Sequence, residues 1–265
     1  MSATPRVLSI AGSDSSGGAG IQADIKTIAM LGGYAMTAIT AITAQNTRGV
    51  QAVEPLSAEL VAAQIDSCLS DIGADAVKIG MLGSPEIAAI VASRLETFSG
   101  VIVFDPVMVA TSGGVLADEA TIAAFAPLMD TATLVTPNLP ELEALTGMPV
   151  GNHEAIAAAA HTLVGLHDCA VLAKGGHAEG ARVMDTLILA DGDFVTFDDP
   201  KILTRHTHGT GCTLSSAIAT LAAHGQPLPH AVRLARQFVR KGIESAPEFG
   251  EGAGPLGHHA VRSLA

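Results

Sequence analysis

The stretch Val7-Leu8-Ser9-Ile10-Ala11 is a mostly apolar run, and a glycine-rich segment at 12–20 separates it from an apolar-periodic run at Ile21–Leu31. A short apolar run bounded by glycine is typical of a buried strand, and the periodicity that follows is typical of a helix. The order of strand, loop and helix recurs along the chain. Because parallel strands are usually joined by a helix, this recurrence predicts a mainly parallel sheet.

The same alternation accounts for most of the chain. We predict strands at Val7–Ala11, Ala38–Ala44, Ala76–Ile79, Val101–Phe104, Thr133–Val135 and Ala170–Ala173. We predict helices at Ile21–Leu31, Ala58–Leu69, Pro85–Leu95, Glu119–Leu128, Pro140–Leu145 and His153–Leu166. The fold class is therefore α/β, a three-layer α/β/α sandwich whose mainly parallel central sheet has helices on both faces.

The C-terminal part departs from this alternation. A hairpin is predicted at Leu187–Phe197, with Asp191-Gly192 as a two-residue turn. The last third then becomes helical and ends in an irregular segment at Gly250–Gly257. No linker or repeat divides the chain, so we expect residues 1–265 to form a single domain.

Composition excludes several classes of partner. The chain carries 14 Lys and Arg against 26 Asp and Glu, a net charge of −12, so we expect neither a nucleic-acid nor a membrane partner. The cysteines at 68, 169 and 212 have no metal-like spacing, and their odd number does not suggest a disulfide framework. The N-terminus has no signal-peptide layout. We expect a cytoplasmic protein.

The stretch His206-Thr207-His208-Gly209-Thr210-Gly211-Cys212-Thr213 places a glycine turn directly before an apolar-periodic helix. Free N–H groups at a helix start bind anions, which suits a phosphate in transit. A thiol at that position is expected to have a lowered pKa, so Cys212 is a candidate base beside a phosphate cradle, as in a kinase. The alternative is an ordinary loop followed by a buried cysteine.

Neither common nucleotide fingerprint fits this chain. No G-x-x-x-x-G-K-[ST] sequence is present, so a P-loop is excluded. Gly18-Ala19-Gly20-Ile21-Gln22-Ala23 fits a relaxed dinucleotide pattern, but the segment 37–46 lacks the carboxylate that would bind ribose. In a parallel sheet, ligands bind beyond the carboxyl ends of the strands. Polar segments follow each predicted strand there: 12–14, 45–46, 80–81, 105–108, 138–141 and 174–177.

These segments resemble the hydroxymethylpyrimidine and phosphomethylpyrimidine kinases of thiamine biosynthesis, within the ribokinase-like superfamily. The resemblance covers nearly the whole chain and is carried by the segments 11–24, 44–50, 78–82, 136–141, 174–177 and 207–213. It implies transfer of the ATP γ-phosphoryl group to the hydroxymethyl oxygen of 4-amino-5-hydroxymethyl-2-methylpyrimidine and then to the resulting monophosphate. Relatives are commonly dimers, so a homodimer is expected.

The resemblance also implies roles for individual residues. Those expected to bind the pyrimidine are Gly12, Asp24, Gln45, Met81 and Val107. The Gln45 amide carries both a donor and an acceptor, which suits the edge of an aminopyrimidine. Residues expected to bind ATP are Lys174, Asn138, Thr210 and Gly211, and those expected near Mg²⁺ are Glu141 and Asp105. The catalytic set is Cys212 as base, the loop Gly209, Thr210 and Gly211, and Lys174.

Two alternatives stay open at this point. The first is a pyridoxal kinase. A cysteine at the position of Cys212 also occurs in some pyridoxal kinases of similar sequence, and pyridoxal presents a hydroxymethyl group on a heteroaromatic ring. A catalytically silent pyrimidine-binding protein on the same fold is the second alternative. It could dispense with Lys174, Glu141 and the loop at 209–212, yet all of them are present.

Overall fold

The computed structural model describes residues 4–110, 113–176 and 180–261. His177, the last residue of the predicted edge segment 174–177, lies outside the described residues.

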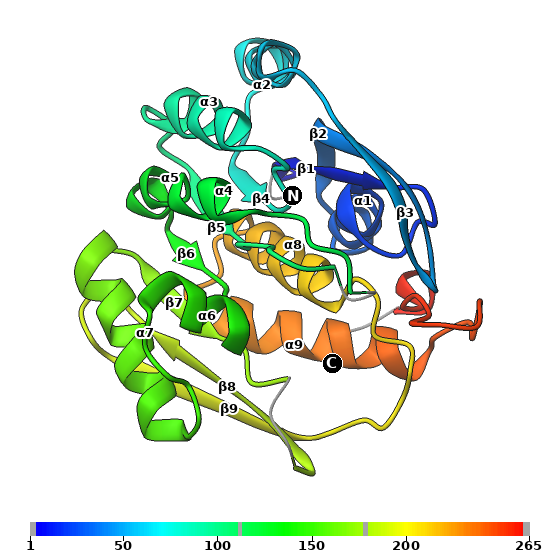
Figure 1. The fold of residues 1–265 in the computed structure, drawn as a ribbon, viewed down its shortest axis with the longest axis vertical. Helices are drawn as coiled ribbons and strands as arrows, with labels where there is room; N and C mark the ends of the chain where they lie inside the picture. Colours follow the sequence, from blue (N-terminus) through cyan, green and yellow to red (C-terminus); the bar gives the residue numbers. More distant parts are fainter. Residues whose placement is uncertain (1–3, 111–112, 177–179, 262–265) are drawn as a thin grey trace.

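Within these ranges, nine strands form one sheet in the order β3-β2-β1-β4-β5-β6-β7-β8-β9 (Figure 1). In the spatial order β2-β1-β4-β5-β6-β7, neighbouring strands pair in parallel. β3 pairs with β2 in the antiparallel direction, as do β8 with β7 and β9 with β8. The bounds are β1 Arg6–Asp14, β2 Tyr34–Asn46, β3 Gly49–Pro55, β4 Ala76–Ile79, β5 Val101–Phe104, β6 Leu134–Val135, β7 Ala170–Ala173, β8 Arg182–Ile188 and β9 Phe194–Pro200.

Helices cover both faces of this sheet (Figure 1). One face packs against α2 Ala58–Asp71, α3 Pro85–Leu95, α4 Glu119–Ala123, α5 Ala126–Thr131, α6 Leu139–Thr146 and α7 His153–His167. The other face packs against α1 Gly20–Met30, α8 Thr210–Ala223 and α9 Leu228–Glu244. A short 3₁₀ turn, η1 His258–Ala260, follows the irregular segment 250–257. The predicted three-layer α/β/α sandwich is confirmed.

Strand alternation accounts for the two cores. Leu8 and Ile10 of β1 belong to the core under α2 to α7, while Val7 belongs to the core under α1, α8 and α9. Successive side chains of a strand point to opposite faces, so a central strand must be apolar on both. The apolar runs of β5 and β7 satisfy this requirement, and β4 does so except at Lys78. The observed bounds of all three strands match the predicted ones.

Two local predictions were wrong, and one strand was missed. The helix expected at 119–128 is divided into α4 and α5, because Pro127 has no N–H to continue the helical ladder. The turn of the hairpin spans 190–192 rather than two residues: Gly192 N–H bonds to Leu189 O, and Gly192 has a φ of 89°. The edge strand β3 was not predicted, because its short, largely exposed sequence mixes apolar and polar residues without a clear strand pattern, and its place in the sheet comes from pairing with β2.

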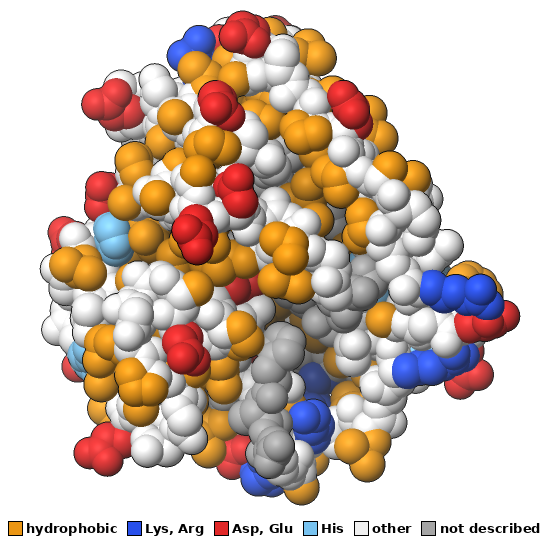
Figure 2. Space-filling view, viewed as in Figure 1, with side chains coloured by type: hydrophobic (Ala, Val, Ile, Leu, Met, Phe, Trp, Pro, Cys, Tyr) orange, Lys and Arg blue, Asp and Glu red, His pale blue; other side chains and the backbone are white. Residues whose placement is uncertain are grey.

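Among the described residues, no helix is long and apolar enough to cross a membrane. On the face seen in Figure 2, carboxylates are scattered over the helices and Lys and Arg form no continuous patch. This distribution agrees with the acidic composition.

Candidate active site

Two of the predicted ligands meet where β5 and β7 end. Lys174 Nζ lies 2.7 Å from Asp105 Oδ1, and the Thr136 hydroxyl donates to the same oxygen at 2.9 Å. Burial alone would raise the pKa of Asp105, but the charges of Lys174 and Lys78 lower it overall. Asp105 is therefore an anion that holds the Lys174 ammonium at the edge of the sheet.

Glu141 lies at the start of α6, beside this pair. Asn138 accepts from the Glu141 N–H at 2.9 Å, and Glu141 accepts from the Asn138 N–H at 2.8 Å, which forms a capping box. Burial raises the pKa of Glu141 to about 7, despite the attraction of Lys174, and the neighbouring Asp105 carboxylate adds to the rise. Two buried carboxylates, Asp105 and Glu141, thus interact with the single ammonium of Lys174. A further cation would be attracted to this corner of the site.

The start of α8 approaches the same cluster. Gly209 caps the helix with a φ of 83° and no side-chain hydrogen bond. The Thr210 N–H donates to Thr207 O at 3.3 Å, so in the described residues the N–H groups of Gly211 and Cys212 are the ones left for another acceptor. A Cβ on Gly211 would lie 3.4 Å from Asp105 Oδ2 and 3.5 Å from Lys174 Nζ. The loop at 209–212, Lys174 and Asp105 therefore form one cluster, although they come from three separate parts of the sequence.

Cys212 is half-buried in the first turn of α8. Its expected low pKa is wrong: burial raises the pKa of the thiol to about 11, although the charge of Lys78 acts in the opposite direction. A helix N-terminus favours a thiolate, but here the cost of desolvation outweighs it. At neutral pH the side chain is a thiol.

The predicted pyrimidine ligands divide into two groups. Gly12 and Met81 are in contact, since a Cβ on Gly12 would lie 3.1 Å from Met81 Sδ. Gln45 is half-buried near the end of β2, where its Nε2 lies 3.4 Å from His208 Nε2, and Val107 is half-buried after β5. Asp24 differs from these, because it is fully buried and its carboxylate is bonded to Lys78, Ser9 and Ser216.

Sequence reasoning missed the buried pair of His208 and Asp14. His208 Nε2 lies 2.8 Å from Asp14 Oδ2, and the same carboxylate accepts from the N–H groups of Ser16, Gly18 and Ala19. Since a carboxylate only accepts, His208 Nε2 carries the proton. The available signal was the position of His208 directly before Gly209 in the glycine motif.

The irregular segment Gly250–Gly257 also contributes to the site, through backbone contacts. Ala253 N–H donates to Thr47 O at 2.9 Å, beyond the end of β2, and His208 N–H donates to Gly254 O at 3.1 Å. The segment therefore connects the β2–β3 turn to the loop that precedes α8.

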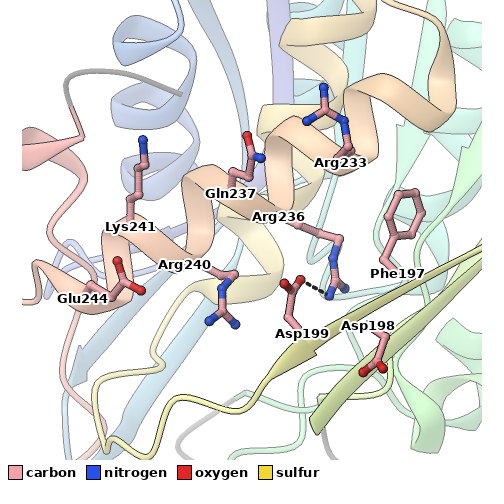
Figure 3. A pocket seen from close by; sticks show the side chains of 9 residues that line it. All are labelled: Phe197, Asp198, Asp199, Arg233, Arg236, Gln237, Arg240, Lys241 and Glu244. Atoms are coloured by element: carbon pink, nitrogen blue, oxygen red, sulfur yellow. Dashed lines mark hydrogen bonds and ion pairs between the residues drawn. The ribbon is translucent and has the colours of Figure 1, made fainter. Parts of the chain in front are cut away.

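A pocket of about 380 Å³ lies between β9 and α9 (Figure 3). Arg236, the most buried of its cations, is ion-paired with Asp185 and Asp199. Arg233 and Lys241 point away from Arg236 in this view. None of the pocket's lining residues belongs to the predicted site, and its cations do not converge on one point.

Comparisons with known proteins agree with this geometry. A family model described as phosphomethylpyrimidine kinase matches residues 14–257. The chain is 48% identical to the hydroxymethylpyrimidine/phosphomethylpyrimidine kinase of Rhizobium meliloti, over 96% of this chain and 97% of that protein.

Solved structures give the same family and a related one. The phosphomethylpyrimidine kinase of Clostridium difficile matches with a TM-score of 0.81 and 39% identity, covering 91% of this chain and all of that one. The pyridoxal kinase of Staphylococcus aureus, solved with AMP-PCP and pyridoxal, matches with a TM-score of 0.89 and 33% identity, covering 98% of this chain and 95% of that one.

Proposed function

The chain belongs to the phosphomethylpyrimidine kinase family, and we propose that it phosphorylates 4-amino-5-hydroxymethyl-2-methylpyrimidine with ATP and then phosphorylates the monophosphate to the diphosphate. The observation that carries this proposal is the approach of the α8 N-terminus to the pair of Lys174 and Asp105. Helix N–H groups and a fixed ammonium side by side form a binding site for a phosphoryl group in transfer.

Lys174 and the α8 loop stabilise charge in this proposal. The Lys174 ammonium attracts the phosphate oxygens of ATP, and Asp105 keeps it in place. The N–H groups of Gly211 and Cys212, which have no backbone acceptor in the described residues, hold the oxygens of the group being transferred. Asn138 sits next to Lys174 through its backbone and orients the nucleotide phosphates.

The Gln45 amide forms hydrogen bonds with the edge of the pyrimidine ring, while Gly12, Met81 and Val107 contact the ring itself. In this proposal the hydroxymethyl oxygen faces Cys212. In a loose phosphoryl-transfer transition state the alcohol loses its proton late, so the base contributes only part of the catalysis. Cys212 accepts that proton in its thiolate form, whose population is set by the raised pKa.

Mg²⁺ fits the carboxylates of Glu141 and Asp105. No group of three or more His, Cys, Asp and Glu residues in the described ranges is placed to hold a metal ion. Mg²⁺ is usually bound by one or two carboxylates together with water and substrate phosphates, so this donor set is sufficient. When bound, the ion would neutralise phosphate charge, and the two carboxylates would orient it or its waters.

The test is incubation of the purified chain with Mg-ATP and each of two alcohols, the hydroxymethylpyrimidine and pyridoxal, with products identified by mass. A pyrimidine monophosphate followed by a diphosphate supports the proposal. Phosphorylation of pyridoxal alone would favour the alternative that the 33% identity to a pyridoxal kinase suggests. Binding of the pyrimidine with no phosphorylated product would favour a silent binding protein.

We further propose a cytoplasmic homodimer. The cysteines Cys68, Cys169 and Cys212 are all free, which suits a reducing compartment. Light scattering during size-exclusion chromatography tests the dimer, and a mass of one chain would exclude it.

A further inference from the structure

Asp185 of β8 carries a buried carboxylate at a position where an apolar side chain is the normal choice. Successive side chains of a strand alternate between its two faces, so Asp185 shares a face with Leu187, which belongs to the core under α1, α8 and α9. Asp185 and its ion-pair partner Arg236 have side chains that are only 7% and 8% exposed. A buried ion pair seldom stabilises a protein more than apolar residues of the same volume would, so stability alone does not account for this pair.

The two carboxylate oxygens of Asp185 have different partners. Oδ2 is ion-paired with the guanidinium of Arg236 in α9. Oδ1 accepts from the Gly175 N–H at 2.7 Å, in a buried hydrogen bond between residues ten positions apart. The buried charge therefore reaches the backbone of the residue that directly follows Lys174.

Arg236 is itself held by β9. Its Nη2 lies 2.7 Å from Asp199 Oδ2, and its Cζ lies 5.6 Å from the centre of the Phe197 ring (Figure 3). A guanidinium is planar and presents its donors in a rigid fork. Held in this way, Arg236 fixes the orientation of the Asp185 carboxylate.

The Gly175 hydrogen bond lies just beyond the point where the pairing of β7 with β8 ends, which is at Ala173. A Cβ on Gly175 would overlap the Met184 carbonyl group, so this turn lies directly against β8. The Lys174 N–H donates to Pro137 O, after β6, at 2.9 Å. The backbone is thus held at two consecutive N–H groups, one toward β6 and one toward β8.

We propose that Asp185 is a positioning residue for phosphoryl transfer. By accepting from the Gly175 N–H, it fixes the turn that carries Lys174, while Arg236 holds the carboxylate in place. Lys174 then has two constraints, Asp105 at its ammonium and Asp185 at its backbone. This inference rests on the proposed function for its catalytic meaning, whereas the hydrogen bond is a property of the ligand-free protein.

The first measurement is the affinity of the full chain for Mg²⁺ with the ATP analogue AMP-PCP, by isothermal titration. Asp185→Ala should weaken this affinity by roughly fivefold or more, because the Lys174 ammonium is no longer held in position. In the Lys174→Ala background the same substitution should change the affinity by less than about twofold, since the residue through which Asp185 acts is absent. An equal loss in both backgrounds would overturn the proposal.

Asp75→Ala is the matched control. Asp75 also accepts from a backbone N–H at 2.7 Å and is also ion-paired with an arginine, Arg6. It lies directly before β4, at the end of the sheet opposite to Lys174. We expect Asp75→Ala to bind Mg-AMP-PCP as the wild type does. A loss as large as that of Asp185→Ala would show that any such defect weakens nucleotide binding, and would overturn the proposal.

The hydrogen bond is tested without a ligand by amide exchange at Gly175, followed by NMR. Exchange should be faster by roughly tenfold or more in Asp185→Ala and unchanged in Asp75→Ala. Unchanged exchange in a folded Asp185→Ala would overturn the proposal. A wild type that protects the Gly175 N–H but binds no AMP-PCP would refute the proposed function and, with it, the catalytic role of Asp185, while the bond itself would stand.

Two double variants cover the case in which Asp185→Ala does not fold. Both carry Arg236→Met, which removes the buried cation, and they combine it with Asp185→Asn or with Asp185→Leu, two side chains of similar size. The amide oxygen of the first can accept from the Gly175 N–H, whereas the second has no acceptor. We expect the Asp185→Asn combination to bind Mg-AMP-PCP roughly threefold or more tightly than the Asp185→Leu combination. Equal affinities would overturn the proposal.

Discussion

His208 Nε2 and Asp14 Oδ2 lie 2.8 Å apart, although 194 positions separate the two residues in the chain. The bond closes the glycine loop after β1 onto the turn that precedes α8. It therefore joins two segments that contain predicted site residues, Gly12 in one and Gly209 to Cys212 in the other.

Asp14→Asn should destabilise the protein at neutral pH by about 3 kcal/mol, because it removes a buried charge partner. Burial alone would raise the pKa of Asp14, but hydrogen bonds from His208, Ser16 and Ala19 hold it below its ordinary value of 3.8. A carboxylate with a lowered pKa stabilises the fold above that ordinary value and loses this contribution as the pH falls through the folded-state value.

We therefore expect urea unfolding to give a difference in the free energy of unfolding between the wild type and Asp14→Asn that is largest at about pH 7 and smaller at about pH 3. A difference of equal size at both pH values would contradict the assignment.

Gln45→Ala should weaken pyrimidine binding by roughly 1–3 kcal/mol, because polar groups of the ring lose their partner. ATP binding should stay nearly normal. Isothermal titration with each ligand measures this, and Gln51→Ala, an exposed glutamine on the neighbouring β3, is the matched control. An equal loss for both ligands would indicate a folding defect instead of a contact.

The raised pKa of Cys212 predicts a pH profile. If the thiolate is the base, kcat/KM should rise with pH from neutrality toward about 11, by up to roughly tenfold per unit. Cys212→Ala should lose about 10²–10⁴-fold in rate while keeping ligand binding, and Cys212→Asp should recover part of it with a flatter profile. Cys68→Ala should behave as the wild type. A wild-type rate in Cys212→Ala would show that the loop acts through its backbone alone.

Gly252→Ala should loosen the segment that connects the β2–β3 turn to the loop before α8, because a Cβ there would overlap the Thr47 carbonyl group. We expect a loss of about 1–3 kcal/mol in stability and a raised KM for the pyrimidine. Gly151→Ala is the control, since a Cβ at Gly151 meets nothing within 4 Å. Thermal unfolding and steady-state kinetics are measured on both variants. If Gly252→Ala has the same stability and KM as Gly151→Ala, the segment does not support the site.

The sequence predicted what depends on local pattern. The central strands β5 and β7 were found because continuous apolar runs bounded by turns are typical of strands buried on both faces, and β4 was found because it is apolar except for Lys78. The edge strand β3 was missed because its pairing with β2 leaves little mark on its own composition.

The site shows the same limit. Lys174 and Asp105 follow apolar strands and could be placed at one edge of the sheet, where they do meet. Lys78 was passed over because a lysine inside an apolar strand has no local signal of its partner, Asp24. The pKa of Cys212 was mispredicted because a helix N-terminus is visible in sequence, whereas burial by distant segments is not.

The central claim is that one cluster carries out both phosphoryl transfers. The most direct measurement supplies the hydroxymethyl compound and its monophosphate separately to the wild type and to Lys174→Ala, with Mg-ATP, and follows ADP and product mass over time. Both substrates should be phosphorylated by the wild type, and Lys174→Ala should lose turnover for both to the same extent, because the same ammonium stabilises each transfer. A variant that loses one transfer and keeps the other at the wild-type rate would contradict the claim.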